Sequence, residues 1–224
     1  MTALRKRCLW LSLPFGILAV VCSYLGVLAG PPFQLDIRML EKVEQKHGRQ
    51  ARQRLTDWQD LIRNDASTTD LEKLEKVNAF FNRVDFIADG LLWKQEDYWA
   101  TPLEFLMLNG GDCEDFSIAK YFTLKKLGVD EDKLNLTYVK ALELNQSHMV
   151  VTYFATPEAE PLVLDNLVDD IRPASARSDL LPVFSFNGSG LWLAKERGRG
   201  RMVGSSDRYR RWQDLLNRMP EGLN

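Results

Sequence analysis

The sequence is poor in cysteine and histidine, with three cysteines and two histidines among 224 residues. Cys8 and Cys22 lie in an apolar N-terminal run, so Cys113 is the one cysteine of the remaining chain. Without that run, no intramolecular disulfide can form. An unpaired cysteine is either buried as a small apolar side chain or used for its reactivity. The scarcity of cysteine therefore directs attention to Cys113.

The sequence also lacks an excess of positive charge. Its formal net charge is -2 at pH 7, which argues against nucleic acid as a partner. Hydrophobic residues make up 45% of the chain, enough for one sizeable core. We therefore expect a single domain after the N-terminal segment.

Residues 1–29 have the organisation of an export signal. Basic residues precede a long apolar run, and small residues end it at Ala29. We expect cleavage after Ala29, a mature domain over residues 30–224 and a periplasmic location. The apolar run is also long enough to span a bilayer, so an uncleaved inner-membrane anchor is the alternative.

Apolar spacing predicts helices in the first half of the chain and strands in the second. Helical periodicity covers residues 36–64 with a break at Gly48, and Thr69 with Glu72 forms a capping box for the next helix. Further helices are expected over residues 103–108 and 113–127. Alternating apolar residues predict strands over residues 134–144, 148–154 and 162–167. These elements predict an α+β fold, with N-terminal helices and an antiparallel sheet packed on the helix that begins at Cys113.

Cys113 is expected at the first turn of a helix. Gly110 and Gly111 permit a tight turn, and Asp112 is a favoured N-cap residue. The positive end of the helix dipole favours a thiolate, which is the nucleophilic form of cysteine. The alternative is a buried cysteine that only fills space.

His148 and Asp165 are expected to meet across two paired strands. A turn centred on Thr156 and Pro157 would place His148 opposite Asp165, where the carboxylate can orient the imidazole. Packing of the Cys113 helix on this sheet would then assemble a nucleophile, a base and an orienter. Taken singly, His148 could be a satisfied histidine at a strand end and Asp165 a turn residue.

Four short segments resemble the bacterial transglutaminase-like cysteine proteinases, the LapG type of periplasmic protease. The segments are Tyr-Trp-Ala-Thr-Pro at 98–102, Gly-Asp-Cys-Glu-Asp-Phe at 111–116, Ser-His-Met-Val at 147–150 and Val-Leu-Asp-Asn at 163–166. The resemblance implies a papain-like α+β core. It also implies that Cys113 is the nucleophile, His148 the base and then the acid, and Asp165 the orienter.

The same resemblance implies a substrate and a regulator. A protease of this type is expected to cut the N-terminal region of a very large surface adhesin between two alanines. Cutting would release the adhesin and disperse a biofilm. Control is expected from an inner-membrane cyclic-di-GMP receptor whose periplasmic domain sequesters the protease.

The resemblance further implies calcium, and the residues around Cys113 supply an independent reason. Asp112, Glu114 and Asp115 surround the thiol, and like charges nearby raise the pKa of a thiol. A bound Ca²⁺ would reverse that effect, and carboxylate oxygens are its preferred ligands. The alternative is that these acids only complement the helix dipole.

Two other classes of protein would use the same residues. A transglutaminase or amidase would share the catalytic plan, but an amine rather than water would accept the acyl group. Incubation with a labelled amine separates these activities. A non-catalytic calcium-dependent binding module would keep Cys113 buried, and its thiol would resist iodoacetamide.

Overall fold

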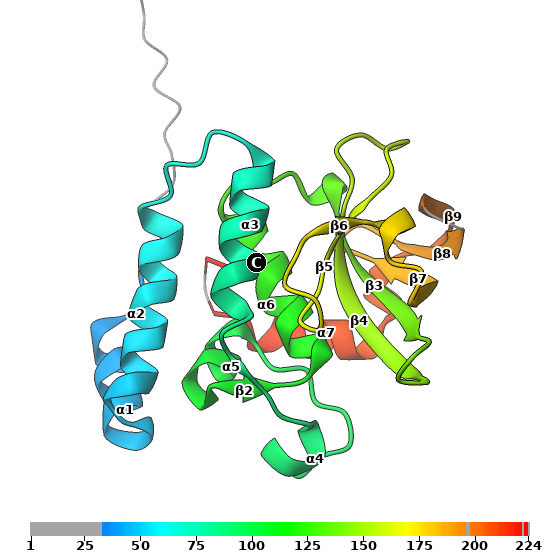
Figure 1. Cartoon of the computed structure of the whole chain (residues 1–224). Helices are drawn as coiled ribbons and strands as arrows, with labels where there is room; N and C mark the ends of the chain where they lie inside the picture. Colours follow the sequence, from blue (N-terminus) through cyan, green and yellow to red (C-terminus); the bar gives the residue numbers. More distant parts are fainter. Residues whose placement is uncertain (1–32, 196–197, 221, 224) are drawn as a thin grey trace, which may run out of the picture. The chain divides into compact units, whose positions relative to one another are not determined.

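The computed structural model describes residues 33–195, 198–220 and 222–223 (Figure 1). They belong to one compact unit that begins at Phe33. The predicted signal peptide or anchor over residues 1–29 lies outside the described residues. Within the described ranges, no helix is both long enough and apolar enough to cross a membrane.

The N-terminal part is helical, as its apolar spacing predicts. Its helices are α1 (Ile37–His47), α2 (Arg49–Arg63) and α3 (Asp70–Phe81). Gly48 separates the first two with a φ of 85°, in the left-handed region that favours glycine. The predicted capping box starts α3, because the Thr69 and Glu72 side chains each accept a hydrogen bond from the other's backbone N–H. The interpretation of residues 36–81 is therefore confirmed.

A segment of short elements connects α3 to the helix that carries Cys113. It contains β1 (Asp85–Phe86), α4 (Asp89–Leu92), α5 (Pro102–Leu108) and β2 (Gly110–Gly111). The predicted helix at 103–108 corresponds to α5, which begins with a second capping box between Thr101 and Glu104. β1 and β2 pair in parallel, and the Ile87 N–H donates to the Gly111 carbonyl at 2.9 Å. This pairing brings α4 next to the turn before Cys113.

The central helix is α6 (Cys113–Lys126). Every residue from Asp115 to Leu124 is buried, because α3 and α5 pack against one side of α6 and the sheet against another (Figure 1). The Trp58 indole N–H donates to the Thr123 hydroxyl at 2.9 Å and ties α2 to this helix. The chain leaves α6 through Gly128, with a φ of 81°. Both ends of the predicted helix are confirmed within two residues.

A seven-stranded antiparallel sheet covers the other side of α6 (Figure 1). Its strands, in the order β6-β5-β4-β3-β7-β8-β9, are β3 (Leu134–Ala141), β4 (Gln146–Tyr153), β5 (Leu162–Leu164), β6 (Arg172–Pro173), β7 (Leu180–Phe186), β8 (Leu191–Lys195) and β9 (Gly198–Gly204). Short 3-10 helices are η1 (Glu131–Lys133), η2 (Ala174–Ala176) and η3 (Ser206–Arg208), and the last helix is α7 (Arg210–Arg218). The predicted α+β architecture with an antiparallel sheet on the Cys113 helix is confirmed.

The strand boundaries differ from the predicted ones at the first hairpin. β3 ends at Ala141, and Leu142 and Leu144 are half exposed in the turn rather than part of the strand. β4 begins at Gln146, so His148 is its third residue. The alternation of leucines continues past Ala141 to Leu142 and Leu144, so the sequence pattern predicted a strand that is three residues too long.

Candidate active site

Cys113 is the first residue of α6, as predicted. Asp112 caps the helix, and its carboxylate accepts a hydrogen bond from the Glu114 N–H at 3.3 Å. Gly111 has no room for a side chain, because a Cβ there would collide with the side chains of Asp115 and Phe105. The glycine therefore lets the first turn of α6 close against the preceding chain.

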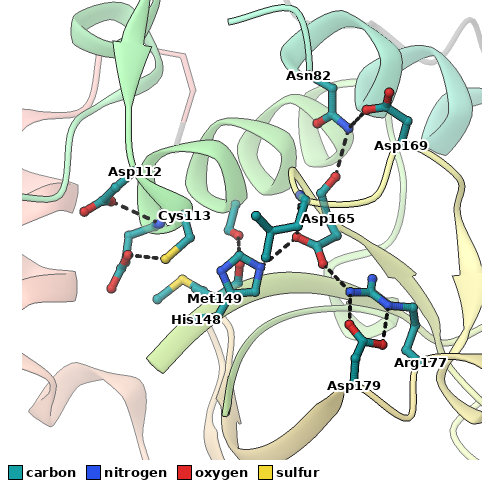
Figure 2. Close-up of polar contacts among 12 residues, drawn as sticks. Asn82, Asp112, Cys113, His148, Met149, Asp165, Asp169, Arg177 and Asp179 are labelled. Carbon is teal, nitrogen blue, oxygen red and sulfur yellow. Dashed lines mark hydrogen bonds and ion pairs between the residues drawn. The ribbon is translucent and has the colours of Figure 1, made fainter. Parts of the chain in front are cut away.

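His148 and Asp165 form a buried pair (Figure 2). The distance from His148 Nε2 to Asp165 Oδ1 is 2.7 Å. The predicted contact is confirmed, but the predicted register is wrong. Val151 pairs with Leu164, so Asp165 falls diagonally across from His148 rather than directly opposite. β5 ends at Leu164, and the chain turns there so that the carboxylate reaches the ring.

The thiol lies at the junction of α6 and β4. α6 packs on β4, and the Ser117 hydroxyl donates to the Met149 carbonyl at 2.9 Å. Figure 2 shows the Cys113 side chain extending from the helix start toward the strand that carries His148. The thiol therefore lies beside the backbone of Met149, which follows His148 in β4.

The Cys113 thiol is surrounded by acidic side chains. Its Sγ donates to Glu114 Oε2 at 2.7 Å. Burial, followed by the charges of Glu114 and Asp112, raises the pKa of Cys113 far above its usual range, although the Met149 N–H acts in the opposite direction. Burial and these acids together favour the neutral thiol.

Besides the acids around the thiol, a second group of acids includes Asp112, the residue before Cys113. Ligand oxygens of Asp89, Asp112 and Asp115 all lie within 4.8 Å of one another. Asp89, at the start of α4, is absent from the sequence-based set because the segment that holds it has no periodicity. Glu114, the third predicted metal residue, does not lie in this cluster; with Asp112 it groups around the thiol.

The chemistry of this cluster fits a calcium ion. Asp89 accepts a backbone hydrogen bond from Tyr98 N at 2.5 Å, and Asp115 accepts a backbone hydrogen bond from Ala100 N at 2.7 Å. Their other carboxylate oxygens are buried and have no hydrogen-bond partner in the described part of the chain. Burial and the neighbouring acids raise the pKa of Asp112 to about 9 and that of Asp115 well above its usual range. Unpaired hard oxygens of like charge are the donor set that Ca²⁺ prefers.

The sequence matches one protein family, described as bacterial transglutaminase-like cysteine proteinases, over residues 47–181. No curated protein matches the chain. Among solved structures, Legionella pneumophila LapG is 44% identical with a TM-score of 0.70, and the match covers 82% of this chain and 97% of that one.

Two further structures of Legionella pneumophila LapG match over 82% of this chain. The EGTA-treated form is 45% identical with a TM-score of 0.71 and is covered to 97%; the calcium-bound form is 44% identical with a TM-score of 0.69 and is covered to 99%. With the fold and the family match in agreement, the chain belongs to the bacterial transglutaminase-like cysteine proteinases and is a cysteine protease with a LapG-like fold.

Proposed function

We propose that this protease is a calcium-dependent endopeptidase whose catalytic triad is Cys113, His148 and Asp165. The observation that carries the proposal is that α6, which begins at Cys113, packs on β4, which carries His148 in a buried pair with Asp165. Three groups in this order supply a nucleophile, a proton carrier and an orienter.

The proposed mechanism gives each ring nitrogen of His148 a separate task. An ionised carboxylate can only accept hydrogen bonds, so in this mechanism Nε2 keeps its proton and donates a hydrogen bond to Asp165. Nδ1 is then the nitrogen that takes the Cys113 proton and later gives it to the leaving amine. The thiolate attacks the scissile carbonyl to form a thioester, and water hydrolyses the thioester. Backbone N–H groups at the start of α6, including that of Cys113, can stabilise the oxyanion.

Asp89, Asp112 and Asp115 would hold the calcium ion. When bound, the ion supplies positive charge that offsets the acids around the thiol and so favours the thiolate. Glu114, which touches the thiol, stays part of the proposal as an acid whose charge the ion also offsets. One of the matching Legionella pneumophila LapG structures is calcium-bound, which supports the same dependence here.

We propose the substrate and its control from the family resemblance. The substrate is the N-terminal region of a large surface adhesin, cut between two alanines, and cutting releases the adhesin and disperses a biofilm. The protease acts in the periplasm, where the periplasmic domain of an inner-membrane cyclic-di-GMP receptor sequesters it. The basic and apolar residues 1–29 support the export step.

The decisive test mixes the protease and Ca²⁺ with the N-terminal region of an adhesin from the same organism. We expect one discrete fragment with a new N-terminus at alanine, and no fragment with Cys113→Ala or with excess EGTA. Iodoacetamide labelling of Cys113 shows whether the protease used has a reactive thiol. If protease with a reactive thiol leaves the adhesin intact, the proposed substrate is wrong. A labelled amine coupled to the adhesin would instead favour the transglutaminase activity.

A further inference from the structure

Asp165 is held by more groups than an orienting carboxylate requires. Its Oδ1 accepts from His148 and from the Leu167 N–H at 3.1 Å. Its backbone carbonyl accepts from Asn82 at 2.9 Å and from Lys120 at 3.0 Å. The three side-chain donors are Asn82 at the end of α3, Lys120 on α6 and His148 on β4, so three elements hold Asp165 in place. The orientation of the carboxylate also depends on the partner of its second oxygen, Oδ2.

The partner of Oδ2 is Arg177, which follows η2. Arg177 Nη2 donates to Asp165 Oδ2 at 2.7 Å, and the Arg177 side chain is only 3% exposed (Figure 2). A second carboxylate, that of Asp179, accepts from Arg177 Nε at 3.0 Å and from Nη2 at 2.8 Å. The guanidinium is therefore locked by Asp179 while it faces Asp165.

The ion pair between Arg177 and Asp165 offsets the cost of burying the Asp165 charge. The Asp165 side chain has no exposed surface, and a buried carboxylate without a cation is strongly disfavoured. Burial alone would raise the pKa of Asp165, but His148, the Leu167 N–H and Arg177 together hold that pKa below its usual range. His148 is a cation only while it carries two protons. During the steps in which its ring is neutral, Arg177 is the cation that bonds the carboxylate.

Lys120 does not replace Arg177 in this task. Its ammonium bonds the backbone carbonyl of Asp165 rather than the carboxylate. Burial also lowers the pKa of Lys120 to about 7, so its charge is not permanent at neutral pH. A guanidinium keeps its charge at every pH at which the enzyme works.

We propose that Arg177 is a positioning residue of the triad, which keeps the Asp165 carboxylate ionised and turned so that Oδ1 faces His148. The proposal rests on the proposed catalytic role of Asp165 and His148. Because Arg177 acts through Asp165, its loss should alter the ring of His148 without altering substrate binding.

The first readout is the tautomer of His148, measured by NMR on protein with 15N-labelled histidine and bound Ca²⁺. The chain has two histidines, so His47 at the end of α1 is an internal reference. We expect a fixed Nε2–H tautomer and a downfield Nε2 proton in the wild type, and mixed tautomers without that proton in Arg177→Gln. Arg177→Lys, which keeps the charge, should restore the fixed tautomer. This readout needs no substrate, so it stands even if the proposed adhesin is wrong.

The second readout is the rate of cleavage. Arg177→Gln should lower kcat about 10- to 100-fold, the usual effect of removing a group that supports a site residue, with KM unchanged. The matched control is Arg172→Gln, which removes an arginine 47% exposed and paired with Asp170 at 3.0 Å. It should change neither kcat nor the His148 signals.

A double-mutant cycle covers the case in which Arg177→Gln alone does not fold. Removing both charges avoids a lone buried carboxylate, so Asp165→Asn/Arg177→Gln is expected to fold. If Arg177 acts only through the Asp165 carboxylate, this double variant should match Asp165→Asn in kcat and in tautomer. The proposal is overturned if Arg177→Gln folds with wild-type tautomer and kcat, or if Arg177→Gln lowers kcat further in the Asp165→Asn background.

Discussion

The Cys113 thiol donates its hydrogen bond to the Glu114 carboxylate and not to His148. This geometry describes a resting thiol, since a neighbouring acid stabilises the protonated sulfur. In the proposed mechanism the thiol proton passes to the His148 imidazole instead. The active state therefore depends on the electrostatics around Cys113 and His148. Substitution of either residue should disable the same proton transfer.

Cys113→Ala and His148→Ala should each lower the cleavage rate at least about a thousandfold, because each removes a member of the proposed catalytic triad. The double variant should be no slower than either single one. The rates are measured as appearance of the adhesin fragment, with circular dichroism to show that each variant is folded. Losses that add in the double variant would mean that the two residues act in separate steps.

Asp89 is the candidate calcium ligand that the structure adds to the residues predicted from the sequence. Asp89→Asn should weaken calcium binding by at least about 10- to 100-fold, the effect typical of groups one layer further from a metal. Isothermal titration of chelator-treated protein measures this directly. Asp60→Asn, an exposed acid on α2, is the matched control and should leave the affinity unchanged. Unaltered affinity in Asp89→Asn would place the ion elsewhere, with Glu114 the next candidate.

At the scale of elements, α7 braces the loop that supports this acid cluster. The Arg218 guanidinium donates to the Trp99 carbonyl at 2.5 Å and to the Tyr98 hydroxyl at 2.6 Å. The backbone N–H groups on either side of Trp99 are those that bond Asp89 and Asp115. The C-terminal helix thus holds the backbone that orients two of the candidate calcium ligands.

Arg218→Gln should therefore lower calcium affinity severalfold while every ligand stays in the chain. The physical reason is a less ordered loop, so that binding must also order the backbone. Arg210→Gln is the matched control, since the Arg210 side chain is 94% exposed and lies 3.9 Å from Asp214. Equal calcium affinity in the two variants, measured by titration calorimetry, would show that α7 does not act on the site.

Elements with strong local signals could be predicted from the sequence. The capping box at Thr69 and the Asp112 cap satisfy backbone groups inside their own helix, so their signals lie within a few residues. β1 and α4 could not be predicted, since two and four residues are too few to show a period. The register of β5 depends on a loop whose geometry no local pattern sets. This error moved the predicted partner of His148 by two positions but left it on the same face of the sheet.

At the scale of the whole molecule, the same contrast holds for the candidate site. Cys113, His148 and Asp165 could be selected from the sequence because each has a local signal. Cys113 is a scarce residue type at a predicted helix start, and His148 and Asp165 lie on two strands that were predicted to pair. Asp89 could not, because its approach to Asp112 and Asp115 depends on the parallel pairing of β1 with β2 and on the Ile87–Gly111 hydrogen bond. A nonlocal contact of two-residue strands leaves no trace in composition or periodicity.

The acid cluster should also make the stability of the whole fold depend on calcium and pH together. Burial raises the pKa values of Asp89, Asp112 and Asp115, that of Asp112 to about 9. Without metal, these acids bind more protons in the folded state than in the unfolded state between about pH 4, the pKa of a free aspartate, and about pH 9. The stability that the acid cluster contributes to the metal-free protein therefore falls as pH rises through that window.

Calcium removes this loss, since it binds the ionised acids of the folded state and competes with protons. At a calcium concentration about 100 times Kd, binding contributes about 2.7 kcal/mol, which raises Tm by about 5–10 °C for a chain of this length. We expect the Tm difference between calcium-saturated and EGTA-treated protein to be small at mildly acidic pH and to widen toward neutral and alkaline pH. Differential scanning calorimetry across that range measures it, and Asp89→Asn should reduce the difference at every pH. A Tm difference that stays constant with pH would mean that calcium does not bind at these acids, because only ligands that titrate in this window can produce the widening.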